Sequence, residues 1–204
     1  MLRTIAFVPS APLLLPSLGG GPAELRQAVD VAVGELTGRV VAVGEAPVTG
    51  LLSGVVDATG FGVAGEPSPN ALPLALAVGA SLAGRAALFG IGPGVDPVAV
   101  GAGLVADSLL VVGDGTAKRT EKAPGHLDPR AEPFDRDVEE ALAAGDPRRL
   151  LALDPGLAAD LWVGGLRAWQ VAAGAAGAGE WEGRVHYAAA PYGVGYVVGV
   201  WQRV

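Results

Sequence analysis

Short runs of apolar, mostly β-branched residues alternate with longer segments of helical periodicity, and no other feature of this sequence restricts its fold as strongly. The runs Thr4–Val8 and Ser108–Val112 have the length and composition of buried strands. Between them, Leu25, Val29 and Val33 recur on one face of a helix. Further strands are predicted at 39–43 and 86–89. This alternation predicts an α/β fold with three layers, α/β/α, around a central mixed, mostly parallel sheet.

The second half of the chain is predicted to be mainly helical before it closes with two strands. Asp146-Pro147 and Asp154-Pro155 are typical helix starts, because Asp caps a helix and Pro fits its first turn. The closing runs 184–190 and 195–201 are expected to be neighbouring strands joined through Pro191-Tyr192-Gly193. Additional helices are predicted at 71–83, 135–144, 147–153, 154–163 and 166–176. We find no linker and no internal repeat, so one domain is expected to span residues 1–204.

The composition excludes several classes of protein. The 204 residues include no Cys and 2 His, and 14 basic residues against 21 acidic ones give a net charge of −7. Without Cys there is no disulfide, no thiolate nucleophile and no iron–sulfur cluster, which fits a cytoplasmic protein. The acidic balance argues against nucleic acid and anionic membranes as partners. No apolar run reaches the roughly 20 residues that a membrane-spanning helix needs, and the Pro-interrupted N-terminus does not fit a signal peptide.

The only strongly polar segment, 113–136, follows a predicted strand. It places Asp114, Thr116, Lys118 and Arg119 just beyond the carboxyl end of that strand, where open α/β sheets bind ligands. Lys118 and Arg119 could together hold a small anion. An alternative interpretation with equal support is a solvated charged loop whose own acidic residues pair with its cations.

Other candidate motifs are weaker. The glycines of 90–94 and 113–115 follow predicted strands, but they lack the third Gly of a dinucleotide loop and the Lys of a P-loop, so they indicate tight turns. No Ser lies in a Gly-x-Ser-x-Gly motif. A two-histidine, one-carboxylate iron site would require His126 and His186 to converge. An exposed His126 and a hydrogen-bonded His186 are the favoured interpretation.

Several segments together resemble the catalytic-subunit-like domain of class III extradiol ring-cleavage dioxygenases. They are 113–135 (GDGTAKRTEKAPGHLDPRAEPFD), 7–16 (FVPSAPLLLP), 165–170 (GLRAWQ) and 190–196 (APYGVGY), so the resemblance covers nearly the whole chain. It implies an α/β domain with a mononuclear Fe²⁺ site at the strand ends that inserts both atoms of dioxygen into a catechol-type ring. Relatives keep this fold with other roles, so the function depends on the metal ligands rather than on the fold.

The positions that match the family's metal ligands carry other residues here. Ser10 stands where the family has its first histidine, and the second histidine falls in the segment 45–48 (EAPV). The third ligand falls near Gly164. Glu45 is the only side chain left at these positions that could bind a metal. The resemblance therefore implies a member without the ferrous site, and we expect no cofactor.

The acid/base histidine of the family aligns with Lys118 or Arg119, and His126 lies where relatives often carry an aromatic residue. The leading hypothesis is a metal-free, dioxygenase-like protein that binds a small molecule, such as an anion, or a protein partner at the former active-site mouth. We assign to this mouth Ser10, Glu45, Asp114, Thr116, Lys118, Arg119 and His126.

Two alternatives stay open. The first is a functional extradiol dioxygenase in which His126 and His186 join Glu45 or Asp114 in a rearranged metal site. The second is a structural or assembly role, because a homo-oligomer is expected and the closing strands carry aromatic residues that could form an apolar contact surface. These aromatic residues are Tyr187, Tyr192, Tyr196 and Trp201.

Overall fold

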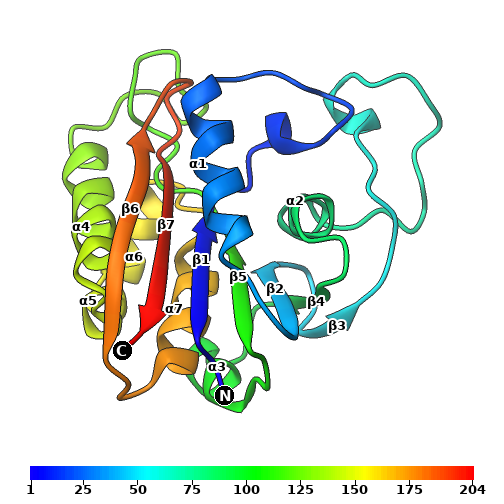
Figure 1. Ribbon diagram of the computed structural model, residues 1–204. Helices are drawn as coiled ribbons and strands as arrows, with labels where there is room; N and C mark the ends of the chain where they lie inside the picture. Colours follow the sequence, from blue (N-terminus) through cyan, green and yellow to red (C-terminus); the bar gives the residue numbers. More distant parts are fainter.

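The protein is built on one seven-stranded mixed sheet with the order β3-β4-β2-β5-β1-β7-β6, in a computed structural model that describes residues 1–204 (Figure 1). The strands are β1 (Thr4–Val8), β2 (Val40–Glu45), β3 (Gly50–Leu52), β4 (Ala87–Ile91), β5 (Ser108–Val112), β6 (Trp181–Ala189) and β7 (Tyr196–Arg203). The helices are α1 (Ala23–Gly34), α2 (Leu74–Leu82), α3 (Pro97–Gly103), α4 (Ala131–Ala144), α5 (Pro147–Leu151), α6 (Pro155–Asp160) and α7 (Leu166–Ala176). The predicted α/β class is therefore confirmed.

The strand pairs are divided evenly between the two orientations. The pairs β1–β5, β2–β5 and β2–β4 are parallel, whereas β1–β7, β6–β7 and β3–β4 are antiparallel. The predicted excess of parallel pairs is not found. One reason is the short connection between β6 and β7, since a tight turn can join only antiparallel neighbours.

Alternate side chains of each central strand enter two separate apolar clusters. In β1, Ile5 and Phe7 belong to a cluster with the apolar residues of α4 and α7, whereas Ala6 and Val8 belong to a second cluster with those of α1 and α2. This is the period of two that a strand buried on both faces requires. The fully apolar sequence of this strand is explained by the same burial.

Most predicted elements are confirmed, with shifts of a few residues at their ends. Asp146 and Asp154 do cap helices: their carboxylates accept the backbone N–H groups of Arg148 at 3.0 Å and Leu157 at 2.9 Å. The short edge strand β3 was not predicted, because its three residues carry too little pattern. The polar segment 113–136 ends inside α4, which begins at Ala131 rather than at 135.

The carboxyl ends of β1, β2, β4 and β5 meet along one end of the sheet, which we call the carboxyl edge. The antiparallel strand β7 begins at this edge, beside the end of β1 (Figure 1). Loops that are far apart in the sequence are therefore placed side by side there. None of the helices combines the length and the apolar character that crossing a membrane requires.

Candidate functional site

Two loops are joined at the carboxyl edge by a pair of hydrogen bonds between Ser10 and Asp114. Because β1 and β5 are adjacent and in register at Val8 and Val112, the residues that follow them lie close together. The backbone N–H of Ser10 donates to Oδ1 of Asp114 at 2.8 Å, and the Ser10 hydroxyl donates to Oδ2 at 2.8 Å. The structure thus brings together two residues that are 104 positions apart.

The Asp114 carboxyl group has no cationic partner. Burial raises its pKa to about 6, and only the hydroxyl and the N–H of Ser10 act in the opposite direction. A buried carboxylate without a positive charge nearby is costly to ionise, because desolvation penalises the charged form. Asp114 therefore has unused capacity to accept a hydrogen bond or to pair with a positive charge.

Tyr196 is brought to this carboxyl by the start of β7. The backbone N–H of Gly115 donates to the Gly195 carbonyl at 2.7 Å, and the N–H of Gly195 donates to the Thr116 carbonyl at 2.7 Å. Tyr196 is 6% exposed, and its hydroxyl makes no hydrogen bond to another residue but reaches the protein surface. Its pKa is raised by burial first and then by the negative charge of Asp114.

A second carboxylate, Asp135 of α4, is bound in the same way but also has a cation. The backbone N–H and the hydroxyl of Thr116 donate to its two oxygens at 2.8 Å and 2.9 Å. Arg119 adds an ion pair of 3.0 Å to Asp135 and a longer one of 3.8 Å to Glu132. Burial still raises the pKa of Asp135, although the N–H of Thr116 and the Arg119 guanidinium oppose it. Thr116 itself is completely buried.

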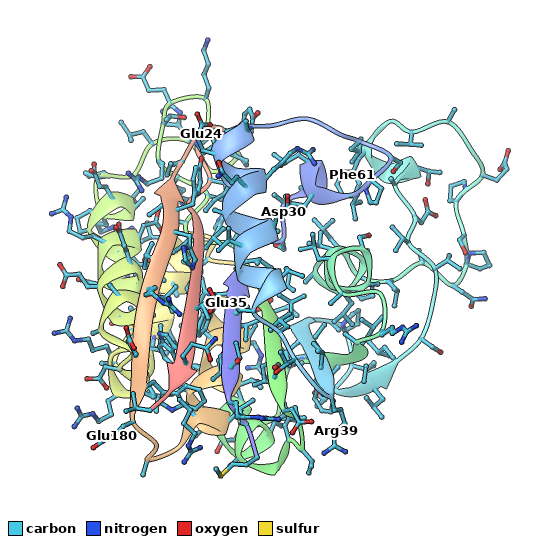
Figure 2. All side chains as sticks on the ribbon, in the orientation of Figure 1. Glu24, Asp30, Glu35, Arg39, Phe61 and Glu180 are labelled. Carbon is cyan, nitrogen blue, oxygen red and sulfur yellow. The ribbon has the colours of Figure 1, made fainter.

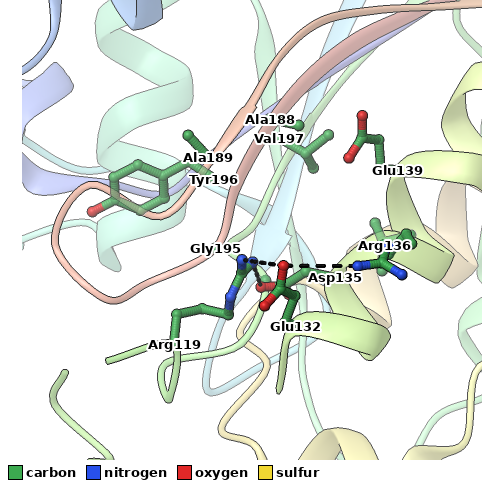
Figure 3. A pocket seen from close by; sticks show the side chains of 12 residues that line it. Arg119, Glu132, Asp135, Arg136, Glu139, Ala188, Ala189, Gly195, Tyr196 and Val197 are labelled. Carbon is green, nitrogen blue, oxygen red and sulfur yellow. Dashed lines mark hydrogen bonds and ion pairs between the residues drawn. The ribbon is translucent and has the colours of Figure 1, made fainter. Parts of the chain in front are cut away.

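A cavity of about 230 Å³ lies beside this second carboxylate, between α4 and the β6–β7 hairpin (Figure 3). Of the seven predicted site residues it is lined only by Arg119. Gly115 and Tyr196 also line it, and in Figure 3 the Tyr196 ring extends to the side opposite Arg136. Its charged lining is dominated by ion-paired groups, because Arg136 also contacts Glu132 at 3.7 Å. Neither Ser10 nor Asp114 lines this cavity.

Lys118 and Arg119 have different partners, although they are adjacent in sequence. The Lys118 ammonium lies 5.4 Å from the ring centroid of Trp162, which is 57% exposed and has a positive φ of 57°. The loop of Lys118 is held there by the Ala117 N–H, which donates to the Leu161 carbonyl at 3.0 Å. The sequence predicts that Lys118 and Arg119 hold a small anion together. In this structure their side chains have different partners and do not form such a site.

His126 lies at the exposed tip of the same polar segment. Its φ is 61°, and its Nδ1 is 2.8 Å from the Glu121 carbonyl oxygen. It makes no contact with Ser10 or Asp114 among the hydrogen bonds and ion pairs of the protein. His126 is thus placed on the outside of the loop rather than at the Ser10–Asp114 pair.

Glu45 ends β2 on the other side of Asp114. Burial raises its pKa, opposed by the positive charge and the backbone N–H of Arg167 in α7. The Arg167 guanidinium donates to the carbonyls of Gly92 and Val95, and its Nε is buried without a partner. Glu45 therefore faces the first turn of α7, where a negative charge is favourable.

Gly164 and Gly165 pack directly on the loop that carries Asp114. A Cβ placed on Gly164 would lie 3.9 Å from the Asp114 Cβ, and one placed on Gly113 would overlap Gly165. The position of the third family ligand thus lies beside Asp114, as does Ser10. Ser10 and Gly164 are therefore both neighbours of Asp114 at the carboxyl edge.

The ferrous centre that the resemblance implies does not fit these residues. Ser10 offers a hydroxyl already bound to Asp114, Gly164 offers no side chain, and Glu45 faces Arg167. No three His, Asp or Glu side chains gather in a group that could hold a metal ion. His186 instead lies 3.8 Å from Glu35, and so it joins no cluster with His126.

The closing aromatic residues do not form one exposed surface. Trp201 is completely buried and Tyr196 nearly so, which corrects the expectation that both could contribute to a contact surface. Trp201 packs edge-on against Phe7 and donates from Nε1 to the Leu142 carbonyl at 2.8 Å. Only Tyr192, in the turn, is mostly open to solvent.

Sequence reasoning did not single out Asp135, Trp162, Arg167 or Tyr196 as site residues. The only sequence signal for Asp135 is its place at the end of the polar segment, and Tyr196 is predicted only as one of the aromatic residues of a contact surface.

No protein-family model matches the chain, and no curated protein matches it either.

Proposed function

We propose that this protein is a degenerate relative of the class III extradiol dioxygenases, with the three-layer α/β/α arrangement of that group, which binds a small organic molecule at the carboxyl edge without a metal. In this proposal it does not cleave aromatic rings. The binding residues are Ser10, Asp114 and Tyr196, and the exposed Trp162 with Lys118 lies at the rim.

The convergence of Ser10, Asp114 and Gly164 carries this proposal. Ser10 and Gly164 stand at two positions that hold metal ligands in the family that the chain resembles, and both contact the Asp114 loop. These residues lie at the ends of parallel strands, where open α/β sheets bind ligands. In this proposal the imidazole groups that bind iron in the family are replaced.

The chemistry of the remaining groups supports binding rather than catalysis. Asp114 can accept a hydrogen bond from a ligand, and the Ser10 hydroxyl is oriented by its bond of 2.8 Å to that carboxylate. A buried, partly desolvated acceptor of this kind discriminates strongly between ligands that satisfy it and ligands that do not.

The test fills the site with a side chain. Gly164 has no positive φ and a Cβ there meets no close contact, so Gly164→Leu is expected to fold and to cover Asp114. Gly103→Leu at the end of α3, where a Cβ also has open space, is the matched control. Catechol, phenylacetate and phenethylammonium are the probes, and calorimetry measures their binding.

We expect at least one probe to bind the parent protein and the Gly103→Leu variant equally, and to bind Gly164→Leu at least tenfold more weakly. Equal binding to all three proteins, or no binding of any probe, would disprove a ligand site at this edge. Anaerobic loading with ferrous iron is expected to leave the protein without a stoichiometric metal and without a yellow ring-opened product from catechol. A yellow product would instead support the alternative of a rearranged dioxygenase.

A further inference from the structure

Strand β6 is an edge of the sheet, and the backbone groups along its outer side have no partner in the protein. Only β7 pairs with it. No other backbone group and no side chain hydrogen-bonds to the backbone of 181–189. In an antiparallel ladder alternate residues turn their N–H and C=O groups away from the neighbouring strand. The outer side of β6 is therefore a row of free donors and acceptors, to which a further strand can pair.

The helix α4 covers one face of β6 but lies apart from it at the carboxyl end of the strand. At the amino end, which follows Glu180 (Figure 2), the two elements are in tight contact, because a Cβ on Gly183 would overlap the Leu142 carbonyl. At the carboxyl end, the cavity of about 230 Å³ separates α4 from Ala188 and Ala189, which are both exposed. This cavity therefore lies next to the free edge of the strand.

The cavity has the size of one side chain rather than of a whole ligand, since pockets that enclose drug-sized molecules measure roughly 300–1,000 Å³. Ala188 lies opposite Val197, whose side chain belongs to the apolar cluster that includes residues of α4. Directly opposite residues of two strands share a face of the sheet. The small side chain of Ala188 thus faces α4 and leaves room there, into which a side chain of an added strand can extend.

The charges around the cavity favour a basic side chain. Its charged lining consists of three carboxylates and two guanidinium groups: Glu132, Asp135, Glu139, Arg119 and Arg136. Both guanidinium groups pair with Glu132, and Arg119 also pairs with Asp135. No ion pair or hydrogen bond reaches Glu139 (Figure 3). One negative charge of the lining therefore has no counterpart in the protein.

We propose that the open edge of β6 and this cavity form a docking site for a basic, extended segment of another protein. The segment adds to β6 as a further strand, and one of its Lys or Arg side chains enters the cavity and pairs with Glu139. In this mode of recognition backbone hydrogen bonds supply affinity, and pockets for alternate side chains supply specificity. The net charge of −7 favours a basic partner as well. The inference does not depend on the proposed function, because neither Ser10 nor Asp114 lines the cavity.

The first experiment measures the binding of four blocked hexapeptides by calorimetry. The probe is acetyl-Thr-Val-Thr-Lys-Thr-Val-amide, and the same peptide with Glu in place of Lys is its charge control. Two further versions of the Lys peptide carry N-methyl groups, one on the odd residues and one on the even residues. We expect the Lys peptide to bind the parent protein and the Glu peptide to bind at least tenfold more weakly. Because a strand donates only alternate N–H groups to its neighbour, one N-methylated peptide should keep its affinity and the other should lose at least tenfold.

The second experiment changes the protein. Glu139→Gln removes the unpaired carboxylate and is expected to weaken the Lys peptide about fivefold. Ala188→Leu fills the cavity and is expected to weaken it at least tenfold. The matched controls are Asp137→Asn, on an exposed position of α4 outside the cavity, and Ala102→Leu, on an exposed position of α3, and both should leave the affinity unchanged. Should Ala188→Leu fail to fold, Glu139→Gln and the N-methylated peptides decide.

Four results would overturn the inference. Equal or tighter binding of the Glu peptide would show that Arg119 and Arg136 govern the cavity. Equal binding of the two N-methylated peptides would exclude the addition of a strand. Failure of the Lys peptide to bind at millimolar concentration would exclude the site altogether. A parent protein that is a dimer in sedimentation, and that Ala188→Leu makes monomeric, would assign the edge of β6 to a second copy of this chain instead.

Discussion

Asp114 and Asp135 are two partly buried carboxylates with almost the same local geometry and opposite electrostatic surroundings. Each accepts one N–H and one hydroxyl from a single residue, Ser10 or Thr116, at distances between 2.8 and 2.9 Å. Asp135 has the Arg119 guanidinium at 3.0 Å, and Asp114 has no cation.

This difference separates a carboxylate whose charge is balanced inside the protein from one whose charge is not. Asp135 ties α4 to the loop after β5, and all its partners come from the protein. For Asp114, only the two hydrogen bonds from Ser10 offset the free-energy cost of removing the carboxylate from water. Its charged form therefore remains unfavourable until another group compensates the charge. Hydrogen-bond geometry by itself would not have distinguished the two.

The largest expected effect is the loss of the compensated carboxylate. Asp135→Ala leaves Arg119 without its close partner and Thr116 without its acceptor in a buried environment. We expect the free energy of unfolding to fall by about 4 kcal/mol, in the range seen when one member of a buried ion pair is removed. Urea unfolding at pH 7 measures it. A loss of less than about 1 kcal/mol would mean that Asp135 does not tie α4 to this loop.

The uncompensated carboxylate is expected to make stability depend on pH. The folded-state pKa of Asp114, about 6, lies above the ordinary aspartate value of 3.8. Its contribution to stability is therefore complete below about pH 4 and is lost as the pH rises through 6. The difference in unfolding free energy between the parent protein and Asp114→Asn should decline by about 3 kcal/mol from pH 4 to pH 7. A difference that is constant over this range, measured by urea unfolding, would contradict the assigned environment.

The smallest effect is expected at the outer end of the Arg119 network. Glu132 is mostly exposed and lies 3.8 Å from Arg119 and 3.7 Å from Arg136. Glu132→Gln should change the unfolding free energy by less than about 0.5 kcal/mol, because solvent screens exposed ion pairs. A larger loss of unfolding free energy would show that Glu132 shares the role of Asp135. Thermal unfolding in low and high salt would distinguish that result from an exposed ion pair that solvent screens.

The sequence predicted the elements with strong local patterns and missed those without one. The buried strands β1 and β5 agree with their predicted ranges, and the Asp-Pro pairs marked the starts of α5 and α6. The edge strand β3 is only three residues long, and the antiparallel share of the sheet depends on strand order. Neither property is contained in a local pattern.

For the candidate site, the sequence by itself determined which residues were available. It contains no Cys and 2 His, and therefore limits any metal centre severely. It also places Ser10 and Asp114 just after apolar strands. The partners of these residues were decided only by the tertiary structure. Placing β1 between β5 and β7 brought Ser10, Asp114 and Tyr196 together, while α4 gave Arg119 its carboxylate. Local sequence cannot specify such contacts, because they depend on which strands become neighbours and on which charges are then enclosed together.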